Sequence, residues 1–151
     1  MAVLETARNP AVDALVTWAA IGSVDRWSGE AKATWRRRGF INIQNARTGQ
    51  VMPLLTNVLD DIDHHGEGRL NIVSAAGKVA VPWLIVHGEE DESVEVADAG
   101  SLHDGSAGKA NLLVIPGAGH TFGAAHPLRE IPPSLDRAIT ESVAWFSRHL
   151  R

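Results

Sequence analysis

Two residues in this chain have the chemistry of an acid–base pair, and each follows a short apolar run. Asp91 comes soon after "PWLIVHG", and His120 ends the stretch "LLVIPGAGH". A carboxylate bonded to an imidazole holds the ring in one tautomer and stabilises the imidazolium that forms when the ring accepts a proton. Such an imidazole can serve a nucleophile as general base and then act as general acid. Asp91 and His120 are therefore the candidate catalytic residues.

The apolar runs are expected to bring these two side chains together. The segments "VDALVTWAAIG", "VPWLIVHG" and "NLLVIPG" are rich in branched residues and end in glycine turns, which predicts about three parallel strands buried on both faces. In an open parallel sheet the ligand site lies beyond the carboxyl ends of the strands. Because Asp91 and His120 follow the second and third strands, we expect both at that end of the sheet.

Helical patterns lie between and after these strands. The segment "SVEVADAGSLHDGSAGKA" is expected to supply a crossover helix, and "SLDRAITESVAWFSRHL" has apolar residues at helical spacing, with Ser134 as candidate N-cap. The alternation of strand and helix predicts an α/β fold for a single domain of residues 1–151. The polar segment 25–78 separates the first two strands by more than one helix, and we interpret it as a lid-like insertion.

Composition excludes several classes of function. A chain of 151 residues with 44 % hydrophobic content is long enough to bury a core, and its net charge of -4 comes from acids and bases that are mixed along the sequence. No basic surface for nucleic acid is expected. The chain has no cysteine, and no apolar run approaches the roughly 20 residues that span a membrane. We expect a cytoplasmic protein with no nucleic-acid or membrane partner.

Several motifs together resemble one known family. "P-W-L-I-V-H-G-x-x-D-x-x-V" and "G-A-G-H-T-F" are similar to the acid and histidine segments of the α/β-hydrolase superfamily, in particular its dienelactone-hydrolase-like and serine-peptidase-like esterases. The segments "ALVTWAAIGSVDRW", "NARTGQVMPL" and "FGAAHP" extend the resemblance over essentially the whole chain. It implies a partial α/β-hydrolase fold, hydrolysis of a carboxylic ester or related acyl compound through an acyl-enzyme, Asp91 as the acid and His120 as the histidine of a catalytic triad.

The nucleophile of that family has no counterpart in this sequence. In the family a serine on a G-x-S-x-G turn precedes the acid and the histidine along the chain, and an earlier strand supplies the oxyanion loop. No G-x-S-x-G occurs here. The resemblance therefore covers the C-terminal half of such a hydrolase, and the chain is expected to be a truncated hydrolase. The alternative is a non-catalytic remnant, or one half of a split assembly, with a binding role.

An incomplete sheet would also leave an open edge. The strand "DALVTWAA" is expected to lack one neighbour, so Leu15, Val16 and Trp18 are expected to be exposed. We therefore expect a homodimer joined through this edge, or pairing with a missing N-terminal half.

The insertion contains further candidate residues. "DDIDHHGEG" echoes a calcium loop at Asp61, Asp63 and His65, but Ile72 stands at the twelfth position, where a glutamate is required, so an exposed loop without metal is expected. No cofactor is expected either. "WRRR" at 35–38 is interpreted as the solvated face of a helix rather than an anion site. The apolar residues Trp27, Phe40 and Met52 either line an acyl pocket or bury the insertion.

Overall fold

The computed structural model describes residues 1–45 and 48–150, which divide into two compact units. The first unit contains residues 1–23 and 72–150, and the second contains residues 24–71. Ala46 and Arg47, which belong to the segment "NARTGQVMPL", lie outside the described residues.

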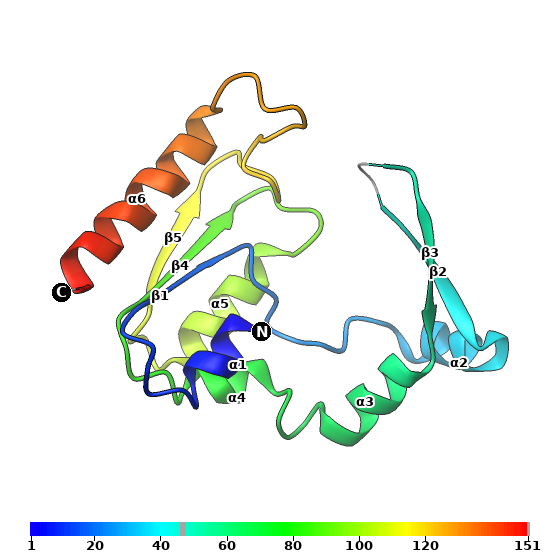
Figure 1. Cartoon of the computed structure of the whole chain (residues 1–151). Helices are drawn as coiled ribbons and strands as arrows, with labels where there is room; N and C mark the ends of the chain where they lie inside the picture. The colour runs from blue at the N-terminus through cyan, green and yellow to red at the C-terminus, as the bar shows by residue number, and fades with distance from the viewer. Residues whose placement is uncertain (46–47, 151) are drawn as a thin grey trace. The chain divides into compact units, whose positions relative to one another are not determined.

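A three-stranded parallel sheet forms the centre of the first unit (Figure 1). Its strands are β1 (Leu15–Trp18), β4 (Trp83–Gly88) and β5 (Asn111–Ile115), in the order β1-β4-β5. In the β1–β4 pair Leu15 lies opposite Trp83, and in the β4–β5 pair Leu84 lies opposite Asn111. The three strands that the apolar runs predict are therefore confirmed, and the loops after β4 and β5 leave the sheet side by side.

Burial differs among the three strands. Every residue of β4 is buried, because this strand has a neighbour on each side and helices over both faces. The strands β1 and β5 are less buried, and β5 exposes Asn111 and Leu112 where it begins. The prediction that all three strands are buried on both faces is wrong for these two, since each has a partner on one side only among the described residues.

Helices cover both faces of the sheet (Figure 1). On one face lies α6 (Pro133–His149), whose Leu135, Ala138 and Trp145 join Leu84 and Val86 of β4 in a hydrophobic core. On the other face lie α1 (Ala2–Thr6), α4 (Ile72–Ala76) and α5 (Val96–Gly105).

The start of α6 corrects one sequence prediction. Its N-cap is Pro132 rather than Ser134, and the helix begins at Pro133. Proline is suited to the first helical position because its φ is already helical and its missing N–H has no partner there anyway. Ser134 therefore lies within the first turn of α6.

The second unit is built on a hairpin and two helices. The strands β2 (Phe40–Gln44) and β3 (Val51–Leu55) pair antiparallel, with α2 (Gly29–Arg38) before them and α3 (Asn57–His65) after them. The Trp35 side chain of α2 is fully buried, and its Nε1 donates to the Leu54 carbonyl at 2.9 Å. This unit ends at Asn71, whereas the insertion predicted from the sequence ran to Lys78; Ile72 and Ala76 of α4 are instead buried in the first unit.

Two further observations concern the described residues as a whole. Within residues 1–45 and 48–150, no helix combines the length and apolarity that a bilayer crossing requires. The same residues contain no group of three or more histidine, aspartate or glutamate side chains arranged to hold a metal ion.

Candidate active site

Asp91 and His120 meet at the carboxyl end of the sheet, as the order of the strands predicts. Asp91 lies in the loop after β4, and His120 lies in the loop after β5. The Nδ1 atom of His120 is 2.9 Å from Oδ2 of Asp91. A carboxylate accepts hydrogen bonds and does not donate them, so this nitrogen carries the proton and Nε2 is left as the basic atom.

The Asp91 carboxylate is fixed by its own loop. Its side chain is fully buried, and its second oxygen, Oδ1, accepts hydrogen bonds from the N–H groups of Ser93 at 2.9 Å and Val94 at 2.8 Å. Burial acts to raise the pKa of Asp91, but these N–H groups and the His120 imidazole outweigh it, so that the pKa lies below its usual value. Asp91 is therefore an anion at neutral pH.

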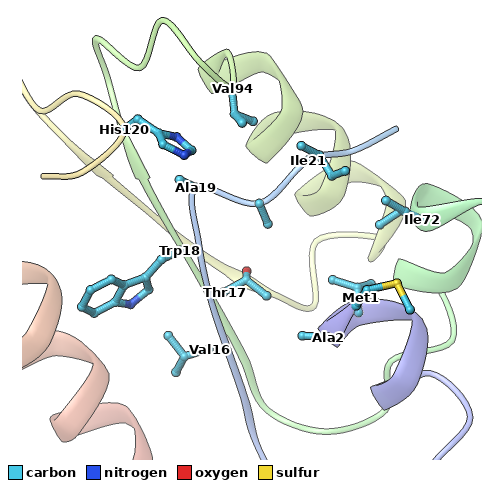
Figure 2. A pocket seen from close by; sticks show the side chains of 12 residues that line it. Met1, Ala2, Val16, Thr17, Trp18, Ala19, Ile21, Ile72, Val94 and His120 are labelled. Atoms are coloured by element: carbon cyan, nitrogen blue, oxygen red, sulfur yellow. The ribbon is translucent and has the colours of Figure 1, made fainter. Parts of the chain in front are cut away.

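The His120 side chain is 43 % exposed, in contrast to its buried partner. It lies at one end of a cavity of about 470 Å³ whose other walls are mostly apolar. Figure 2 shows that this cavity follows β1, with Val16 and Trp18 on one side of the strand and Thr17, Met1 and Ile72 on the other. Side chains from both faces of β1 line this cavity and none from β4 does, so the cavity runs along the edge of β1 that has no strand partner among the described residues.

A glycine allows the loops that carry Asp91 and His120 to approach each other closely. A Cβ atom on Gly88, the last residue of β4, would lie 2.2 Å from the Ala118 carbonyl oxygen. Two hydrogen bonds join the loops at this point, from Glu89 N–H to the Ile115 carbonyl at 3.0 Å and from Glu90 N–H to the Ala118 carbonyl at 2.9 Å. The bonded loops place Asp91 beside His120.

The loop that carries His120 is anchored by Phe122. This side chain is 1 % exposed and belongs to the core under α6, where its ring contacts Trp18 edge-to-face at a centroid distance of 5.5 Å. The backbone of Phe122 has φ of 54°, a conformation that is unfavourable for a bulky residue. The packing of the ring holds the loop in this strained turn two residues after His120.

His87 is a site residue that sequence reasoning missed. Its side chain is fully buried, with Nε2 2.8 Å from the Val94 carbonyl and 3.4 Å from Oδ2 of Asp91. The available signal in the sequence is the histidine inside the otherwise apolar run "PWLIVHG". A polar side chain that is buried with such a strand requires a hydrogen-bond partner.

Charged side chains of the polar motifs in the second unit form ion pairs with one another. Arg36 of "WRRR" contacts Asp60 at 3.0 Å and also Asp63. Asp61 contacts Arg69 at 2.6 Å. Asp61 and Asp63 belong to α3, so the prediction of an exposed loop is wrong for "DDIDHH". The arginine partners of these carboxylates lie outside that helix, Arg36 on α2 and Arg69 in the segment after α3.

The apolar residues of this unit differ in how they pack. The Trp27 ring contacts Trp35 edge-to-face at a centroid distance of 5.2 Å, so it helps to bury the unit. Phe40 and Met52 of the hairpin remain 43 % and 40 % exposed.

Comparison with known proteins identifies the fold but no close relative. No family model matches the sequence, and no curated protein matches it. Solved structures do match. The esterase domain of a Rhodothermus marinus protein aligns with 99 % of this chain and 57 % of its own, at a TM-score of 0.61 and 17 % identity. A monoacylglycerol lipase of Paleococcus ferrophilus aligns with 97 % of this chain and 63 % of its own, at a TM-score of 0.59 and 15 % identity.

A third structure is a predicted dienelactone hydrolase of Klebsiella pneumoniae. It aligns with 98 % of this chain and 47 % of its own, at a TM-score of 0.55 and 18 % identity. The chain thus spans between about half and two thirds of the length of these three structures. Its three-stranded parallel sheet with flanking helices is part of the α/β-hydrolase fold.

Proposed function

We propose that Asp91 and His120 are the orienting acid and the general base of a serine-type hydrolase that acts on a carboxylic ester or a related small acyl compound. The observation that carries this proposal is the 2.9 Å contact between His120 Nδ1 and Asp91 Oδ2, with the acid buried and the histidine open to a cavity. The pair has the polarity that the reaction needs, because the contact leaves Nε2 as the basic atom on the imidazole.

The proposed reaction has two steps. A serine hydroxyl attacks the acyl carbonyl while His120 Nε2 takes its proton, and the resulting imidazolium returns the proton to the leaving alcohol. Water then attacks the acyl-serine while His120 Nε2 takes a proton from it, and the imidazolium returns a proton to the serine oxygen as the carboxylic acid leaves. Asp91 remains ionised and stabilises the imidazolium, which agrees with the lowered pKa of its carboxyl.

The serine is proposed to come from a segment that lies beside β1. Asp91 is the one hydrogen-bond partner of His120 within the described part of the chain, and the sequence contains no G-x-S-x-G. The cavity that reaches His120 follows the unpaired edge of β1, so a strand added at that edge would bring its own loop to the histidine. The same edge equally favours the second candidate, one half of an assembly whose role is binding.

The DNA upstream of the Met1 codon distinguishes these two functions. An in-frame G-x-S-x-G within about 30 codons favours the hydrolase, and stop codons throughout favour the binding role. If the G-x-S-x-G is present, the upstream segment that contains it is produced together with this chain, and hydrolysis of p-nitrophenyl acetate is measured. His120→Ala is expected to lower kcat by about 10³- to 10⁴-fold or more, and Asp91→Asn by a similar factor.

His64→Ala is the matched control, because His64 is an exposed histidine of α3 whose Nδ1 lies 2.6 Å from the Asp60 carbonyl oxygen of its own helix. Hydrolysis that survives His120→Ala would refute the proposed role of this histidine.

A further inference from the structure

His87 is a buried histidine that the proposed reaction does not use. It lies next to the end of β4, and its side chain is fully buried. Leu84 and Val86 of the same strand belong to the core under α6. Because side chains alternate along a strand, His87 faces the opposite side of the sheet, where α5 lies. It therefore reaches the loop that joins Asp91 to α5.

The surroundings of the His87 ring assign its proton. Nε2 faces two acceptors, the Val94 carbonyl at 2.8 Å and Asp91 Oδ2 at 3.4 Å, so this nitrogen must be the donor. Nδ1 is buried and has no hydrogen-bond partner among the described residues. A proton there would be a buried donor without an acceptor, which is unfavourable. The ring is therefore neutral and carries its proton on Nε2.

The loop after β4 is held by a connected set of hydrogen bonds. His87 Nε2 donates to the Val94 carbonyl, and the Val94 N–H donates to Asp91 Oδ1. The other oxygen of Asp91 accepts from His120. The imidazole of His87 thus contacts the carbonyl of the residue whose N–H binds one carboxylate oxygen, and it lies 3.4 Å from the other carboxylate oxygen.

We propose that His87 is a positioning residue for the acid–base pair: its Nε2–H holds the Asp91–Val94 turn so that Oδ2 of Asp91 faces His120. The purpose of this role rests on the proposed hydrolase function, but the geometry can be tested without a nucleophile or a substrate. It differs from a simple core-filling role because it requires a donor at one particular atom. A side chain of similar polarity whose donor lies elsewhere is expected not to hold the Asp91–Val94 turn in place.

Two amide substitutions separate these roles. In His87→Gln the terminal amide nitrogen lies near the position of Nε2, whereas in His87→Asn it lies near the position of Nδ1, one bond too short to reach the Val94 carbonyl. Both amides are polar and uncharged, so neither introduces a buried charge.

The experiment uses the 151-residue chain labelled with ¹⁵N, and long-range ¹H–¹⁵N spectra of the imidazoles report which nitrogen of each histidine carries the proton. In the native chain we expect the Nε2–H tautomer for His87 and the Nδ1–H form for His120. In His87→Gln the His120 signals are expected to remain unchanged. In His87→Asn they are expected to shift toward the average of two tautomers, and the protected Nδ1 proton of His120 is expected to be lost.

Two results would overturn the proposal. One is a native spectrum in which His87 carries its proton on Nδ1 or is doubly protonated. The other is a folded His87→Asn chain whose His120 signals match those of the native protein. If His87→Asn does not fold, the tautomer of His87 in the native chain decides, since Nε2–H supports the proposal and Nδ1–H refutes it. None of these outcomes depends on hydrolysis, so a failure of the proposed function is recognised separately.

Discussion

The acid and the base of the candidate site differ sharply in their environment. Asp91 is fully buried and bound by two peptide N–H groups, whereas His120 is 43 % exposed and opens to a cavity. Two peptide N–H groups and the His120 imidazole keep the orienting acid ionised although burial acts to raise its pKa, and the same hydrogen bonds fix its position. A general base must reach the reacting group, which requires exposure. The two environments agree with two different roles for the residues of one pair.

The lowered pKa of Asp91 predicts how stability depends on pH. Its native pKa lies below the value of about 4 in the unfolded chain, so the ionised carboxylate stabilises the fold above that pH, and this contribution is lost as the pH falls through the native pKa. Asp91→Asn removes the charge and is expected to cost about 1–3 kcal/mol at pH 7. Urea unfolding of both chains at pH 7, 4 and 2.5 measures the difference, which should shrink below about pH 4. A difference that stays constant over this range contradicts the assignment.

At the scale of the elements, the contact between the loops after β4 and β5 depends on Gly88. Gly88→Ala would place a Cβ atom against the Ala118 carbonyl and force the loops apart. We expect a loss of about 1–3 kcal/mol in the free energy of unfolding, together with weakening of the contact between Asp91 and His120. Urea unfolding and the imidazole ¹⁵N spectra of His120 measure the two effects.

Gly100→Ala is the matched control for this prediction. Gly100 lies within α5, and a Cβ atom there meets nothing within 4 Å. Alanine is expected to stabilise this helix by about 0.5–1 kcal/mol. If Gly88→Ala proves as harmless as Gly100→Ala, the close approach of the loops does not hold the pair.

The sequence predicts the strands that carry Asp91 and His120 better than it predicts the tertiary contacts that align the two side chains. Continuous apolar runs identify β1, β4 and β5, and their order places Asp91 beside His120. The sequence analysis does not predict the hairpin of β2 and β3, because most of its apolar residues are exposed and lack a core-facing pattern, and because β3 contains Pro53, which is unusual within a strand. The contact of Gly88 and the positive φ of Phe122 arise from tertiary packing, which no local pattern records.

At the scale of the whole molecule, one edge of β1 has no strand partner among the described residues. The expectation of an exposed patch is right for Trp18, which is 38 % exposed, and wrong for Leu15, which is 7 % exposed. Leu15 is buried because α1 contacts β1. Val16 is partly buried against the core under α6. The cavity beside β1 is therefore a better target for a test than the strand itself.

We expect this edge to pair with a second copy or with a serine-bearing segment. Ala2 is exposed and lines the cavity, so Ala2→Lys places a charge there without disturbing the core. Sedimentation of the native chain at tens of micromolar should show a species larger than the monomer, and Ala2→Lys should shift it to the monomer. Ala144→Lys, at an exposed position of α6, should change nothing. A native chain that sediments as a monomer contradicts self-association through this edge.

The central claim is that this chain supplies the base and the orienting acid for a serine that lies outside residues 1–151. Serine-directed fluorophosphonate labelling of the purified chain tests it most directly, because the reagent reacts with a serine only where a base activates it. We predict labelling of the native chain no stronger than that of His120→Ala or of the urea-unfolded chain. Strong labelling of one serine that disappears in His120→Ala would show that the nucleophile lies within this chain and would contradict the account.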